Sequence, residues 1–162
     1  MQANRGICGL LSKMSQVVSD PMLRASLDEQ IEVKRRLLDT LYDCNDSLRR
    51  DPRPVRDLAL EGLLQQGEAA LTIDDPMVRD LVIATSDLRF LYWTLAGCAS
   101  LASLWRQLDQ PHLGVELEHS VYQLTGAREQ LEWMLETLLR RGGDRATPEI
   151  VQRHQIPVPH RA

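Results

Sequence analysis

Residues 76–108 read PMVRDLVIATSDLRFLYWTLAGCASLASLWRQL, and this stretch decides the fold. Asp74 and Asp75 are candidate caps before Pro76, which suits the first turn of a helix. At about 1.5 Å of rise per residue, a helix over the whole stretch is roughly 48 Å long. Between Leu81 and Leu104 apolar side chains occur on more than one face. This pattern is typical of the buried central helix of a bundle.

The rest of the chain predicts helices over residues 7–18, 21–48, 55–71 and 112–140, because apolar residues recur there at helical spacing. The apolar stripe of residues 21–48 is interrupted at Lys34, which we place with its charged neighbours on the solvent-facing side. No segment shows the alternation of a β-strand. The predicted fold class is therefore all-α, a four-helix bundle with a short crossover helix over residues 55–71.

The chain after residue 142 lacks this periodicity. Gly142 and Gly143 predict the end of the last long helix, and three prolines follow within residues 148–159. We therefore expect a bundle over residues 1–142 and an extended or disordered tail over residues 143–162.

Composition bounds the class of protein. The chain has 162 residues, 26% of them charged, and a formal net charge of −4, so no global charge attracts it to nucleic acid or to an anionic membrane. Its three cysteines have no metal-site spacing, which favours reduced thiols in a cytoplasmic protein. No apolar run has the length or flanks of a signal peptide or membrane span, so we expect no membrane partner.

Five short segments, in this order, resemble the YciF-like branch of the ferritin-like superfamily, a group of bacterial stress-associated proteins. They are LSKM at 11–14, PMLR at 21–24, EGLLQQG at 61–67, LVIA at 81–84, and the segment 117–131. The resemblance spans about residues 5–140. It implies a ferritin-like four-helix bundle that forms homodimers and holds two metal ions between its helices.

The sequence departs from that family at the positions that would hold the metal. In an ungapped comparison, residues without anionic or imidazole groups occupy the family's ligand positions. These residues are Asn4, Gln30, Val33, Phe90, Leu91, Trp93 and Gln123, and only Tyr92 of the family's Glu-His-Tyr-Glu run is kept. An iron centre needs several carboxylate or imidazole ligands, so we expect no catalytic residues, no metal and no cofactor.

One local pattern remains as an alternative metal site. Glu116 and His119 have the Glu-x-x-His spacing of ferritin-like metal motifs, and Glu118 lies beside them. For iron binding, this face of the last helix would have to turn inward. If it is solvated instead, the pattern has no such role.

Asp87 and Arg89 interrupt the apolar central helix. One interpretation is a buried polar network with Gln30 and Gln123, in which each buried group must be paired. The other is that both side chains point to solvent or across a subunit boundary.

Two surfaces are candidate binding sites. Phe90, Trp93, Gly97 and Ser100 combine aromatic and small residues on the central helix, which favours a homodimer face. Arg49, Arg50 and Arg53 surround a proline-rich break and form a possible anion contact, although a solvated connector is the alternative and we do not expect nucleic acid as a partner.

The leading hypothesis is a non-catalytic protein of the ferritin-like class that has lost its di-metal site. It would act through contacts with itself and an unidentified protein partner, as a stress-associated accessory or adaptor. The alternative is a metal-dependent oxidase or iron-handling protein with a shifted site near Glu116 and His119.

Overall fold

The computed structural model describes residues 2–47, 57–108 and 111–153, and every regular element in those ranges is an α-helix. The helices are α1 (Gln2–Val17), α2 (Pro21–Ser47), α3 (Leu58–Ala70), α4 (Pro76–Gln107) and α5 (Pro111–Arg153). The predicted all-α class, with four main helices and the short crossover helix α3, is confirmed. None of the described helices is long and apolar enough to cross a membrane.

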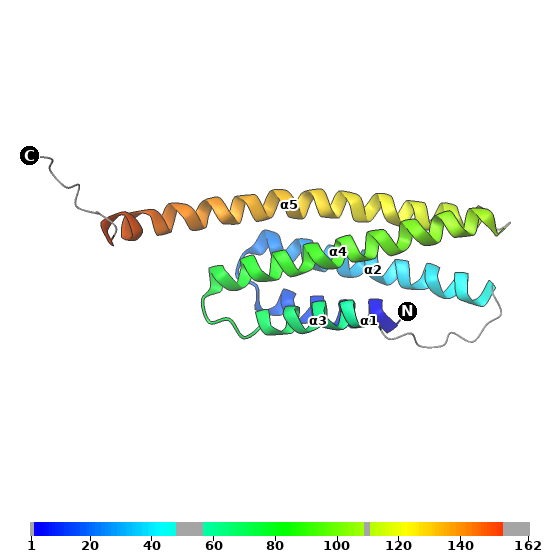
Figure 1. The fold of residues 1–162 in the computed structure, drawn as a ribbon, viewed down its shortest axis with the longest axis horizontal. Coiled ribbons are helices and arrows are strands. Elements are labelled where there is room, and N and C mark those ends of the chain that lie inside the picture. Colours follow the sequence, from blue (N-terminus) through cyan, green and yellow to red (C-terminus); the bar gives the residue numbers. More distant parts are fainter. Residues whose placement is uncertain (1, 48–56, 109–110, 154–162) are drawn as a thin grey trace, which may run out of the picture.

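Each of these helices packs against at least two of the others around one core. The longest interface joins α4 to α5, while α2 packs against both α1 and α5. The crossover helix α3 lies against α4 and α1 (Figure 1). The core is mostly leucine and isoleucine, supplemented by Phe90 and Met14, which are both fully buried.

Aspartates cap three of the helices, and the cap at Asp75 is the one that the sequence analysis names. Asp75 accepts hydrogen bonds from the backbone nitrogens of Met77 and Val78 at 2.9 and 3.0 Å, with Pro76 in the first turn of α4. Asp20 accepts in the same way at the start of α2, and Asp57 does so at the start of α3. Such caps satisfy amides that have no partner within the helix.

Gly67 lets α3 approach its neighbours closely. A Cβ atom at this position would lie 2.6 Å from a Leu10 methyl carbon, 2.9 Å from that of Met14 and 3.3 Å from the Phe90 ring. The glycine that weakens α3 as an isolated helix therefore permits its packing against α1 and α4.

The last helix is longer than predicted. α5 does not end at Gly142 and Gly143 but continues to Arg153, so the expectation of an extended tail from residue 143 was wrong for the residues up to 153. Gly142 is buried, and a Cβ atom there would lie 3.4 Å from the side chain of Met77. Packing against α4 supports the helix where its intrinsic propensity is lowest. Residues 154–162 lie outside the described residues.

Candidate functional site

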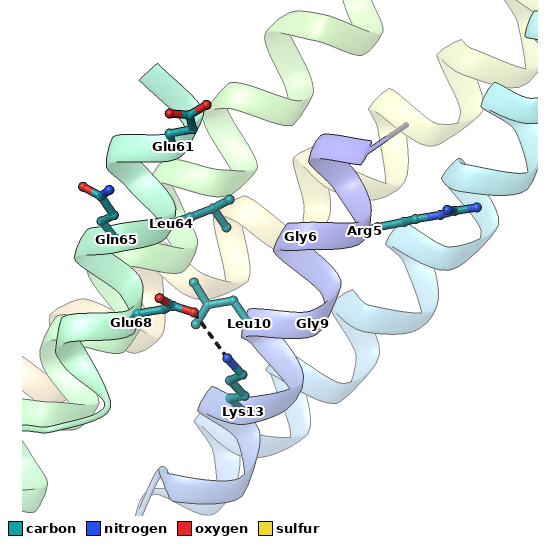
Figure 2. A pocket seen from close by; sticks show the side chains of 9 residues that line it. All are labelled: Arg5, Gly6, Gly9, Leu10, Lys13, Glu61, Leu64, Gln65 and Glu68. Carbon is teal, nitrogen blue, oxygen red and sulfur yellow. Dashed lines mark hydrogen bonds and ion pairs between the residues drawn. The ribbon is translucent and has the colours of Figure 1, made fainter. Parts of the chain in front are cut away.

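A shallow groove runs between α1 and α3 (Figure 2). Its volume is about 390 Å³, and its lining residues include no serine, cysteine or histidine. Lys13 and Glu68 form an exposed ion pair at 3.3 Å at one end. Arg5 points away from the groove, and its guanidinium lies 5.3 Å from the centre of the Tyr42 ring. The groove therefore contains no serine, cysteine or histidine that could act as a nucleophile, and the charge of Lys13 is paired with that of Glu68.

A polar cluster lies in the centre of the bundle. Gln30 and Lys34 come from α2, and Asp87 and Thr94 come from α4. Lys34 and Asp87 are 0% exposed, and Gln30 and Thr94 are almost as deeply buried. The Gln30 amide donates to Asp87 Oδ2 at 2.7 Å, and the Lys34 ammonium donates to Thr94 Oγ1 at 3.2 Å. The sequence prediction that placed Lys34 on a solvent-facing side was therefore wrong.

Burial shifts the pKa values of both charged groups. Loss of solvent raises the pKa of Asp87 to about 6, although the nearby positive charge of Lys34 and the hydrogen bond from Gln30 both oppose the rise. Loss of solvent also lowers the pKa of Lys34, and the negative charge of Asp87 opposes that change. Each charge therefore stabilises the other in a region that disfavours both.

This cluster does not fit a di-metal centre. It offers one carboxylate, one amide and one hydroxyl, with an ammonium group placed among them. A pair of hard metal ions needs several anionic oxygen or imidazole ligands, and a buried ammonium repels cations. The donor set of these four residues is therefore unsuited to the metal site that the resemblance implies.

The buried network is confirmed for two of its predicted members. Asp87 and Gln30 bond to each other inside the core. Arg89 instead lies on the surface, where it donates to Gln66 Oε1 at 2.5 Å. Gln123 is only half-buried.

Glu116 and His119, the alternative metal pair, are both exposed on α5. Their neighbour Glu118 forms an ion pair with Arg106 of α4. Within the ranges that the structure describes, no group of three or more histidine, cysteine, aspartate or glutamate side chains is placed to hold one metal ion.

The cysteines are poor candidates for nucleophiles. All three are free thiols, and Cys44 and Cys98 are buried. Burial raises the pKa of Cys98 to about 11 and also raises the pKa of Cys44. Because the thiolate is the reactive form, these two side chains are unreactive at neutral pH.

The predicted dimer face needs correction at one residue. Phe90 is fully buried beneath α3, where its ring lies against Gly67. Trp93 is half-buried, whereas Gly97 and Ser100 are exposed.

The possible anion contact of Arg49, Arg50 and Arg53 lies outside the described residues.

α4 continues past the ends of α1 and α3 (Figure 1). Helical spacing from Phe90 brings Gly97, Leu101 and Leu104 of α4 and its C-cap residue Leu108 into one line, which we call the α4 end stripe. Leu104 and Leu108 are each 47% exposed and Leu101 is 37% exposed. The steps of four, three and four residues match the seam of a helix that pairs with another helix. The sequence pattern did not identify these leucines as surface residues, because a helix with apolar residues on several faces is typically buried.

Comparisons with known proteins place the chain in a family. A family model described as "Domain of unknown function (DUF892)" matches residues 1–142, and no curated protein matches the chain. The crystal structure of the E. coli stress protein YciF is similar, with a TM-score of 0.78 and 16% identity over 85% of this chain and 88% of YciF.

A second similar structure is YcfI from Rhodopseudomonas palustris, described as "a putative structural protein". It has a TM-score of 0.72 and 21% identity over 81% of this chain and 84% of YcfI. At these identities the two structures show a shared fold. Together with the family match, they identify this chain as a member of the YciF-like DUF892 family.

Proposed function

We propose that this chain is a non-catalytic protein of the ferritin-like class that has lost its di-metal site. It acts through protein–protein contacts, as a stress-associated accessory or adaptor. The observation that supports the proposal is the buried cluster of Gln30, Lys34, Asp87 and Thr94 between α2 and α4, which holds an ammonium group and only one carboxylate. The description of YciF as a stress protein and of YcfI as a structural protein agrees with this role.

The α4 end stripe is the contact surface in this proposal. Exposed apolar residues that lie together on one face mark interaction sites more often than isolated ones do. A second copy of the chain is the simplest occupant, since the same stripe from two copies can pair around a two-fold axis. Gly97 adds no side chain to this face, and a Cβ atom built there would meet nothing within 4 Å in the single chain. A partner helix can therefore approach closely at that point.

Leu104→Glu tests this contact. We expect the unchanged chain to be a dimer at tens of micromolar in sedimentation velocity experiments, and the variant to be a monomer, because a carboxylate would be buried in the paired stripe. The helical circular dichroism spectrum should be unchanged, since Leu104 is 47% exposed in the single chain.

Leu139→Glu is the matched control. Leu139 is 55% exposed and lies on the C-terminal half of α5, whereas the N-terminal half of that helix meets the end of α4 at Gly114. This variant should remain a dimer. An unchanged chain that sediments as a monomer, or two variants that dissociate equally, would contradict the proposed contact.

A further inference from the structure

Two buried oxygen atoms of the polar cluster lack a hydrogen-bond donor. The Gln30 amide uses both of its N–H groups, because Nε2 donates to Asp87 Oδ2 at 2.7 Å and to Ser26 Oγ at 3.4 Å. Gln30 Oε1 and Asp87 Oδ1 are the remaining oxygens of these two bonded groups, and neither has a hydrogen-bond partner among the residues that the structure describes. The Lys34 ammonium does not supply the missing donors, since its hydrogen bond is to Thr94 Oγ1.

One proton can pair both of these oxygens. An ionised carboxylate only accepts hydrogen bonds, whereas a protonated carboxyl group also has one O–H donor. A carboxyl group and a primary amide have complementary edges and can form two hydrogen bonds, one in each direction. The N–H half of such a pair is present between Gln30 and Asp87, and a proton on Asp87 Oδ1 gives Gln30 Oε1 the donor that it lacks. Because buried acceptors without donors destabilise a fold, the folded chain gains stability from this proton.

Few charged or titratable groups surround Asp87. Lys34 of α2 is the charged group that acts on its pKa, and it opposes protonation. Cys8 of α1 and Cys98 of α4 interact with Lys34, but burial raises the pKa of both thiols, so neither is charged at neutral pH. Asp80, two turns earlier on α4, is bonded to backbone nitrogens of the turn between α1 and α2. The buried residues of α3 and α5 that the structure describes include no titratable side chain.

We propose that Asp87 and Gln30 form a pH-dependent latch between α2 and α4. In mild acid, Asp87 takes up one proton from solvent on Oδ1, loses its negative charge and donates this proton to Gln30 Oε1. The two side chains are then joined by two hydrogen bonds, whereas the ionised form at neutral pH has one. The latch therefore holds α2 and α4 together more firmly as the pH falls.

NMR spectra of the unchanged chain between pH 8 and pH 4.5 test the latch. We expect the Asp87 Cγ signal to titrate with a pKa of about 6, and the Gln30 Cδ signal to move with the same midpoint. Below that pH a slowly exchanging carboxyl proton should appear, with a nuclear Overhauser contact to the side-chain amide protons of Gln30. The variant Gln30→Met should lose this signal, because methionine offers the carboxyl proton no oxygen acceptor.

Asp87→Asn is the matched variant for stability. Asparagine has an N–H₂ group where the protonated carboxyl group has its O–H, so this variant should form both hydrogen bonds at every pH. With a pKa of about 6 in the folded chain and an ordinary value of 3.8 in the unfolded chain, the proton on Asp87 lowers the unfolding constant by about tenfold between pH 8 and pH 5. Urea unfolding at both pH values should show this tenfold difference in the unchanged chain relative to Asp87→Asn.

Three results would overturn the proposal. The first is an Asp87 Cγ signal that does not titrate above pH 4.5. The second is a Gln30 Cδ signal that stays constant while Asp87 titrates. The third is a carboxyl proton whose Overhauser contacts are to Thr94 or Lys34 rather than to Gln30. The spectra of the unchanged chain decide the matter if a substituted chain does not fold.

Discussion

Lys34→Met is expected to destabilise the fold by about 3–5 kcal/mol at pH 8, the usual cost of leaving a buried charge without a compensating charge nearby. The methionine fills a similar volume, so the loss is electrostatic rather than a loss of packing. It leaves the Asp87 carboxylate, which is 0% exposed, without its positive neighbour. Urea denaturation gives the difference in the free energy of unfolding.

The double variant Lys34→Met, Asp87→Leu is the matched control. Because both charges are removed together, its stability should be close to that of the unchanged chain or higher. The comparison forms a double-mutant cycle with the single variants. If the two single effects simply add in the double variant, the charges do not interact and our account of the core is wrong.

The single variant Lys34→Met should be less destabilised, relative to the unchanged chain, at pH 5 than at pH 8. The Asp87 pKa is raised to about 6 from an ordinary value of 3.8, so the folded chain takes up this proton before the unfolded chain does as the pH falls. The contribution of Asp87 to stability therefore rises as the pH drops from above 6 towards 3.8. Removing Lys34 raises the Asp87 pKa further, so at pH 5 the variant holds a neutral carboxyl group. A pH-independent difference between the two chains would contradict this reading.

Asp80→Ala is expected to cost about 2–4 kcal/mol, because hydrogen bonds to a charged group contribute more than neutral ones do. Asp80 is 3% exposed. It accepts from the backbone nitrogen of Ser19 at 3.0 and 3.1 Å and from that of Asp20 at 2.8 Å. It therefore fixes the turn between α1 and α2 to the first turns of α4. Thermal unfolding followed by circular dichroism measures the loss.

Asp80→Asn is the control for this prediction. It keeps the shape of the side chain and one accepting oxygen but loses the charge, so we expect it to be destabilised by less than the alanine variant. A loss below about 0.5 kcal/mol for the alanine variant, which is typical of an ordinary surface change, would show that the turn does not depend on Asp80.

The fold could be predicted from the sequence because helix caps and apolar spacing are local features of the chain. The Asp-Pro pairs at 20–21 and 75–76 mark two helix starts, and the structure places caps at both. Apolar spacing then predicts which faces meet. The end of α5 was mispredicted because the contact of Gly142 with Met77 joins residues far apart in the chain, and glycine propensity alone cannot report it.

The sequence predicted only part of the buried polar cluster. Lys34 stands three residues after Ile31 and four before Leu38, which is a regular position in the apolar stripe of α2. The position of Lys34 in the apolar stripe therefore indicates that this lysine is buried. Asp87 on α4, whose charge acts on Lys34, is 53 positions away in sequence. Its proximity to Lys34 depends on how α1 and α5 place α2 and α4.

Our central proposal is that this chain has lost the di-metal site that the resemblance implies, and that Lys34 and Asp87 lie in the core between α2 and α4 instead. The most direct test is titration of the purified chain with ferrous iron under anaerobic conditions, followed by desalting and elemental analysis. We predict well under a tenth of an iron atom per chain, in Asp87→Asn as in the unchanged protein. Two iron atoms per chain, lost in Asp87→Asn, would contradict the account.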